Sequence, residues 1–129
     1  MTKEYHTGGT MRQVFALDDL FSRYIRLRDN NICVTCGKQL EKGMECGHLF
    51  SRVNTMTRFD ERFAFCQCHE CNRYHEANRN RFDTVFINRY GEKLYAEGLK
   101  LAGKVKIWSL DEMDELAEKF KSEIKRLGG

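Results

Sequence analysis

Residues 46–72 read CGHLFSRVNTMTRFDERFAFCQCHECN, and this stretch decides the fold that we predict. It carries a histidine near its start and ends with a Cys-x-x-Cys pair, Cys68 and Cys71. Another Cys-x-x-Cys pair stands upstream, at Cys33 and Cys36. Two such pairs in one short chain are typical of a tetrahedral zinc site, in which the thiolates join segments too small to bury a sufficient core. We therefore predict that these four cysteines hold a structural Zn²⁺.

The remaining cysteines are Cys46 and Cys66. Cys66 could replace Cys68 as a ligand, but only the pair Cys68 and Cys71 has the knuckle spacing. We interpret Cys46 and Cys66 as buried thiols on two strands. In the reducing cytoplasm, cysteines in such pairs indicate metal ligands before they indicate disulfides.

The composition bounds the class of protein. The chain has 129 residues, 41% hydrophobic and 32% charged, which fits one globular domain with one or two small cores. It lacks a run of roughly 18 apolar residues, and the opening MTKEYHTGGT lacks the apolar core of a secretion signal. We therefore expect no membrane span and a cytoplasmic location.

Charge points only weakly to a partner. The net charge of +3 favours binding to nucleic acid only slightly. The placement of the charge is more informative, because the basic residues are concentrated in residues 73–106. This region is a candidate phosphate-facing surface, although solvated helix faces would give the same pattern.

The periodicity predicts an α+β fold, with a zinc-stapled hairpin and helix flanked by N- and C-terminal helices. We expect a flexible lead-in over residues 1–16 and a single domain over residues 17–129, in which the zinc-stapled core occupies about 30–80 and a helical extension 81–129. The first predicted element is a helix from Leu17 to about Arg28. Strands near 44–50 and 63–66 follow, joined by an exposed loop over 52–61. Helices are then predicted after Cys68, over 81–90 and near 94–101, and a last helix is capped by Ser109 and Glu112. The apolar stripe of the last helix predicts packing within the chain or between chains.

His48 and Asn72 are the residues for which we predict chemistry. An imidazole can activate water at neutral pH, and an amide oxygen suits Mg²⁺ or Mn²⁺. Strand alternation would direct His48 toward the helix after Cys68, where Asn72 follows a zinc thiolate. His75 and Glu76 lie one helical turn on and share the face of Asn72, so either could complete a catalytic metal site.

The order of these motifs resembles the HNH nucleases, also called ββα-metal or His-Me finger nucleases, including zinc-stapled junction-cleaving phage nucleases of the endonuclease VII type. More closely, four segments resemble the phage lambda NinG (Rap) recombination family, and the similarity covers about residues 17–92. The segments are DLFSRYIRLRD at 19–29, CGHLFSR at 46–52, RFDER at 58–62 and QCHECNRY at 67–74.

The resemblance implies a metal-dependent endonuclease that acts on branched DNA, such as Holliday junctions or flaps, in phage recombination. It implies His48 as general base, Asn72 as a ligand of the catalytic metal, and a phage or prophage protein in a bacterial host. Two positions depart from the HNH pattern. Gly47 stands where an acidic residue or histidine often binds the metal, and Phe63 replaces the middle Asn that orients the base. Three outcomes are then open: the protein is slow, it holds His48 by another contact, or it has lost activity.

The alternative is a catalytically weak or inactive zinc-containing recombination accessory protein that binds branched DNA, and the two departures favour it. A protein-interaction adaptor that uses the last helix is a further reading. Cleavage of both strands of a junction needs two active sites, which suggests a homodimer. The arginines that we predict to contact DNA are Arg52, Arg58, Arg73, Arg79 and Arg81.

Overall fold

The computed structural model describes residues 11–129 except residue 78, and the side chains of residues 74–80 also lie outside the described part. Its elements are α1 (Met11–Arg28), β1 (Met44–His48), the 3-10 turn η1 (Glu61–Phe63), β2 (Ala64–Cys68), α2 (His69–Ala77), α3 (Arg79–Tyr90), α4 (Glu92–Ala102) and α5 (Leu110–Arg126). The described chain is thus an α+β fold of five helices around a two-stranded antiparallel hairpin, as predicted.

The two strands of the hairpin give it two faces with different neighbours. The register pairs Cys46 with Cys66 and Glu45 with Gln67. Because side chains alternate along a strand, each pair defines one face. The α1 face consists of Met44, Cys46, His48, Ala64, Cys66 and Cys68, and the α2 face consists of Glu45, Gly47, Phe65 and Gln67.

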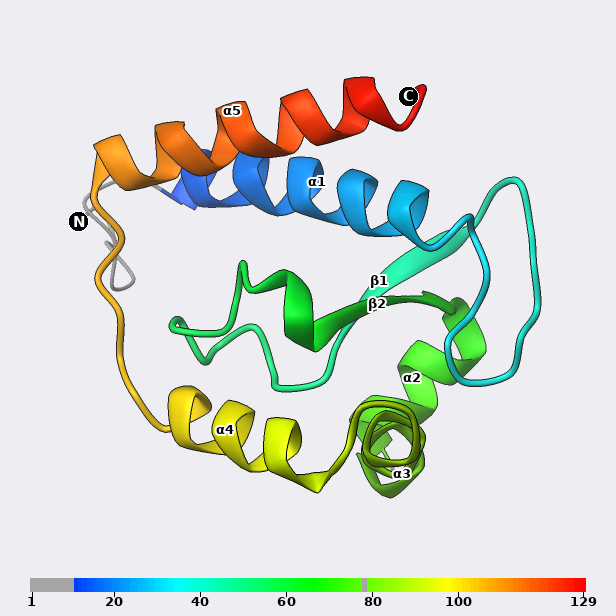
Figure 1. The fold of residues 1–129 in the computed structure, drawn as a ribbon. Helices are drawn as coiled ribbons and strands as arrows, with labels where there is room; N and C mark the ends of the chain where they lie inside the picture. Colours follow the sequence, from blue (N-terminus) through cyan, green and yellow to red (C-terminus); the bar gives the residue numbers. More distant parts are fainter. Residues whose placement is uncertain (1–10, 78) are drawn as a thin grey trace.

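A separate apolar core covers each face, and Figure 1 shows the hairpin between the two groups of helices. The first core joins α1 to α5, which run side by side in the same direction above the hairpin. Its buried side chains include Phe21, Ile25, Phe59 and Phe120. The second core joins the hairpin and the residues that flank it to α3 and α4, through Leu49, Phe50, Phe63, Phe65, Phe82 and Phe86. The chain therefore builds two small apolar cores, and a third buried cluster lies around the cysteines, consisting of Cys33, Met44, Cys66, Cys68 and Cys71.

The first helix begins at Met11, so our prediction of a start at Leu17 is wrong and residues 11–16 are not a flexible lead-in. Val14 and Leu17 both lie in the first core with residues of α5. This partner lies at the other end of the chain, so local sequence did not reveal it. The predicted end is confirmed, because Asn30 and Asn31 follow the helix with φ angles of 54° and 55°. Residues 1–10 lie outside the described residues.

The connection between the strands is largely packed, so our prediction of an exposed loop over 52–61 is wrong. Thr57 and Phe59 are buried. Thr55 accepts hydrogen bonds from the segment between α4 and α5: its carbonyl from Trp108 Nε1 at 2.9 Å and its hydroxyl from the Lys106 amide at 2.8 Å. Polar loop residues are buried here because a distant segment satisfies them.

The helical extension agrees with the prediction in outline. Ser109 and Glu112 form the predicted capping box of α5, and Gly91, with a φ of 95°, follows α3. Gly98 on α4 is buried, and a Cβ there would lie 2.5 Å from Phe50 and 2.8 Å from Phe63. The helix therefore packs closely against these two rings of the second core. None of the helices within the described residues is long and apolar enough to span a bilayer.

Candidate functional site

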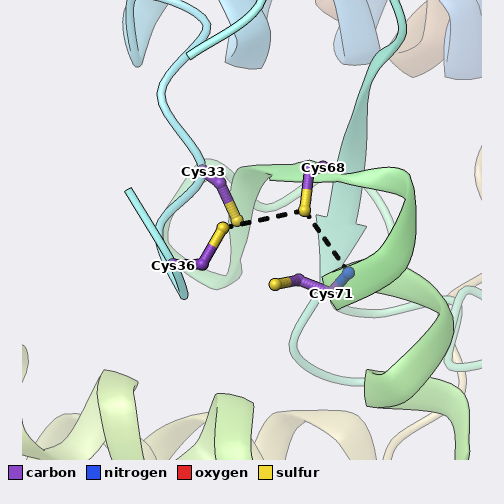
Figure 2. A group of neighbouring side chains, drawn as sticks. All are labelled: Cys33, Cys36, Cys68 and Cys71. Carbon is purple, nitrogen blue, oxygen red and sulfur yellow. Dashed lines mark hydrogen bonds between the residues drawn. The ribbon is translucent and has the colours of Figure 1, made fainter. Parts of the chain in front are cut away.

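The four predicted zinc ligands come together at one end of the hairpin. The sulfur atoms of Cys33, Cys36, Cys68 and Cys71 all lie within 4.8 Å of one another. The Cys36 and Cys68 sulfurs are 3.8 Å apart, which is about the edge of a tetrahedron with bonds of roughly 2.3 Å. Figure 2 shows the side chains converging from the loop after α1 and from the junction of β2 with α2. This cluster fits a structural Zn²⁺, as predicted.

The other two thiols differ from the cluster in environment. Cys46 and Cys66 lie opposite each other on the α1 face, outside the group of four. Burial raises the pKa of each to about 12, so both stay protonated at neutral pH. At Cys33, burial alone would raise the pKa, but hydrogen bonds from nearby backbone amides outweigh it and lower the pKa. Burial and the neighbouring thiols raise the pKa of Cys71, so the assignment of the site rests on the geometry of the four sulfurs.

His48 is the last residue of β1 and is held from two sides. Its Nε2 lies 3.0 Å from the carbonyl oxygen of Arg58, and its ring centroid lies 5.7 Å from that of Phe21. Since a carbonyl oxygen can only accept, Nε2 carries the proton and Nδ1 is the acceptor nitrogen of the neutral ring. Arg58 thus supplies an orienting contact that sequence reasoning could not name.

The surroundings of His48 keep its ring neutral. The pKa of His48 is lowered to about 4, chiefly by burial and also by the charges of Arg52 and Arg58, while the Arg58 carbonyl and Asp18 offset part of the effect. In the unfolded chain the ring has its ordinary pKa near roughly 6.5, so between about pH 6.5 and pH 4 the unfolded chain takes up a proton that the folded chain refuses. The stability contribution of His48 is therefore lost as the pH falls through this window.

We expect the wild-type protein to lose about 1 to 2 kcal/mol more unfolding free energy than His48→Asn between about pH 7 and pH 5, because Asn cannot take up the proton. Urea unfolding of both proteins at each pH measures this difference. Acid loss of zinc affects both proteins alike and cancels in the comparison. Equal losses in the two proteins would show that the ring titrates normally in the folded state.

Asn72 lies on the opposite face of the hairpin from His48. Its Nδ2 donates to Glu45 Oε1 at 2.9 Å, and His69 Nδ1 lies 2.7 Å from Glu45 Oε2. Burial would raise the pKa of Glu45, but the contacts with Asn72 and His69 outweigh it and lower the pKa, so the side chain is a carboxylate. Our expectation that alternation directs His48 toward the helix after Cys68 is therefore wrong, because Glu45 and not His48 has that parity.

Gly47 is the residue of the α2 face beside His48, and it has no room for a side chain. A Cβ there would lie 1.8 Å from Gln67 Oε1. Gln67 is fully buried, and its Nε2 donates to Thr35 Oγ1 at 2.9 Å. Its Oε1 has no hydrogen-bond partner among the residues that the structure describes. The amide of Gln67 therefore occupies the place that a larger residue at position 47 would take.

The predicted DNA-contacting arginines fall into different settings. Arg73 and Arg81 are exposed and form no ion pair within the described part of the chain. Arg52 is half exposed and lies 3.5 Å from Asp18. Arg58 is not available, because its guanidinium binds both carboxylate oxygens of Asp18 and is only 13% exposed. The side chain of Arg79, like those of His75 and Glu76, lies outside the described residues.

Sequence reasoning missed Glu45, Gln67 and His69, which the structure brings to the α2 face together with Asn72. The strand period of two could have indicated Glu45, since it has the parity of Gly47. For Gln67, only the register of β1 against β2 shows which residue it faces.

The four-cysteine cluster and the helix-covered hairpin define an α+β protein with a site that could hold zinc. Residues 12–128 match the family described as Bacteriophage Lambda NinG protein, and this chain belongs to that family. Two curated relatives, Protein ninG of Escherichia phage 933W and Protein ninG of Enterobacteria phage VT2-Sa, are each 27% identical over 106 residues, which is 81% of this chain and 52% of the relative. The chain thus spans about half the length of these relatives. No solved structure matches it.

Proposed function

We propose that this protein is a metal-dependent endonuclease of phage recombination that cuts branched DNA, built on an HNH-type unit. Membership of the NinG family and the order hairpin, zinc cluster and helix support this proposal. The observation that carries it is the contact between His48 Nε2 and the Arg58 carbonyl at 3.0 Å. This contact fixes the tautomer with Nδ1 as the acceptor nitrogen, as a general base requires. The lowered pKa of the ring makes it a weak base and favours the second candidate below.

His48 and the predicted metal ligand Asn72 lie on opposite faces of the hairpin. A DNA backbone could reach both side chains only by passing around the end of β1. His48 is the last residue of β1, and the neighbouring Gly47 belongs to the α2 face. Asn72 contacts Glu45, three residues before His48 along β1, and the Gln67 amide fills the space beside Gly47. Catalysis therefore requires the DNA backbone to bridge the end of the strand. A divalent cation held on the α2 face would supply stabilisation of the charge that develops on the phosphate.

The second candidate is a recombination accessory protein that binds branched DNA without cutting it. His48 and Asn72 lie on opposite faces of the hairpin, and Gly47 stands where an acidic residue often binds the metal. Both features favour this candidate, because they leave the base without a metal ligand beside it. In this reading the exposed side chains of Arg73 and Arg81 contact phosphates, and binding weakens steeply with salt.

A cleavage assay separates the two candidates. We expect zinc-loaded protein to cut a labelled four-way DNA junction when Mg²⁺ or Mn²⁺ is present, and His48→Ala to slow the cut by about 100-fold or more. Lys125→Ala, an exposed substitution on α5, is the control and should cut like the wild type. Junction binding without a cut at any protein ratio would select the accessory protein, and full activity of His48→Ala would overturn His48 as the general base. Light scattering with and without the junction tests the predicted homodimer.

A further inference from the structure

The α2 face of the hairpin carries three oxygen-bearing side chains whose arrangement the zinc cluster fixes. Gln67 directly precedes the ligand Cys68, and Asn72 directly follows the ligand Cys71. Glu45 lies directly opposite Gln67 across the strands and contacts Asn72 at 2.9 Å. Opposed residues of an antiparallel pair have Cβ atoms only about 4.5–5.5 Å apart. A zinc ion bound by the cysteines would therefore hold both Gln67 and Asn72 beside Glu45.

The buried amide of Gln67 is the feature that a purely structural role leaves unexplained. Its Nε2 is satisfied by Thr35, but Oε1 is buried and finds no partner within the described residues. Leaving such an acceptor unsatisfied destabilises the folded state. The oxygen lies against Gly47, where a Cβ would be 1.8 Å away. Only a glycine at position 47 therefore leaves room for this buried, unpaired oxygen.

We propose that Glu45, Gln67 and Asn72 bind a hard divalent cation, Mg²⁺ or Mn²⁺, with Gln67 Oε1 in the place that a side chain at position 47 would otherwise fill. Carboxylate and amide oxygens are the ligands that these cations prefer, and Mg²⁺ keeps several waters, so three protein ligands suffice. Asn72 can present its oxygen to the cation if its side-chain amide flips, since the oxygen and nitrogen of an amide are assigned only from their contacts. His69, which lies 2.7 Å from Glu45 Oε2, orients the carboxylate.

This inference deepens the proposed function, because it names the side chains that hold the cation of the same site. Glu45 has the strand parity of Gly47, so it supplies the carboxylate that position 47 lacks. The departure at Gly47 then reflects a different set of ligands on the same face.

Manganese binding to the zinc-loaded full chain tests the site directly. Titration with Mn²⁺, followed by the loss of the free-ion signal in electron paramagnetic resonance, should show one Mn²⁺ per chain while the zinc content stays constant. Glu45→Gln should weaken this binding by about tenfold or more, because it removes the only negative ligand. Glu70→Gln is the matched control, since Glu70 lies in the first turn of α2 but faces Lys38 and is largely exposed. Its affinity should equal that of the wild type.

Gln67 is tested by a substitution that keeps its shape. Gln67→Glu should bind Mn²⁺ more tightly, because it places a charge beside the cation, whereas a side chain with no role as ligand would give unchanged or weaker binding. In nitrogen-15 spectra, Mn²⁺ should broaden the side-chain amide signals of Gln67 and Asn72 before that of Gln13 on α1. No Mn²⁺ binding at millimolar concentration, or equal affinity of Glu45→Gln and wild type, would overturn the site.

The outcomes also separate this inference from the proposed endonuclease. Manganese binding that depends on Glu45, without any cleavage of junctions, would leave the cation site standing and overturn the endonuclease. Cleavage that depends on His48, with Mn²⁺ affinity unaffected by Glu45→Gln, would do the reverse.

Discussion

Cys71→Ser is expected to abolish stoichiometric zinc binding and to destabilise the protein by at least ~5 kcal/mol, a large share of the ~5–15 kcal/mol that stabilises a typical domain. The four sulfurs join the loop after α1 to the junction of β2 and α2. Apart from the sulfurs, hydrogen bonds join this loop to β2, among them Val34 N–H to the Cys66 carbonyl at 2.9 Å and Gln67 Nε2 to Thr35 Oγ1 at 2.9 Å. These bonds remain when the metal is removed, but the four sulfurs are then no longer held together.

Zinc analysis and thermal unfolding measure the effect, and a chelator added to the wild type should reproduce it. Cys46→Ala is the matched control, because Cys46 lies on the same hairpin but outside the cluster. It should keep one zinc per chain and lose much less stability. Cys71→Ser protein with full zinc content and unchanged unfolding would show that the cluster is not a metal site.

Asp18→Ala is expected to destabilise the protein by about 3 kcal/mol, the usual cost of removing one partner of a buried ion pair. Asp18 is 8% exposed, and the Arg58 side chain that binds both its oxygens is 13% exposed. Removal of the carboxylate would leave the Arg58 guanidinium nearly buried without a counter-charge. The pair also ties α1 to the loop whose Arg58 carbonyl holds His48, so the same substitution should loosen that contact.

The neighbouring residue supplies the control for this prediction. Asp19 lies on the same helix but is exposed, so Asp19→Ala should change the unfolding free energy by less than about 0.5 kcal/mol. In urea unfolding, Asp18→Ala with Arg58→Ala should cost less than the sum of the single substitutions, because the second removes the unpaired charge left by the first. Equal effects of Asp18→Ala and Asp19→Ala would show that the pair contributes nothing.

The sequence alone determined the features that depend on local spacing. A knuckle needs only two cysteines three residues apart and a turn between them, so Cys33, Cys36, Cys68 and Cys71 could be assigned from their positions. A helix cap is likewise set within one turn, as Ser109 and Glu112 show.

Only the tertiary structure decided which side chains meet. The direction of His48 follows from which face of the hairpin α1 and α5 cover, and α5 comes from the far end of the chain. Arg58 was predicted to contact DNA, but its charge is bound by Asp18, a residue 40 positions away in sequence. Glu45, Gln67 and Asn72 become neighbours through the register of two strands and the docking of α2. Spacing along a chain specifies contacts that one turn or knuckle makes, whereas contacts across faces depend on how the whole chain divides its apolar surface between two cores.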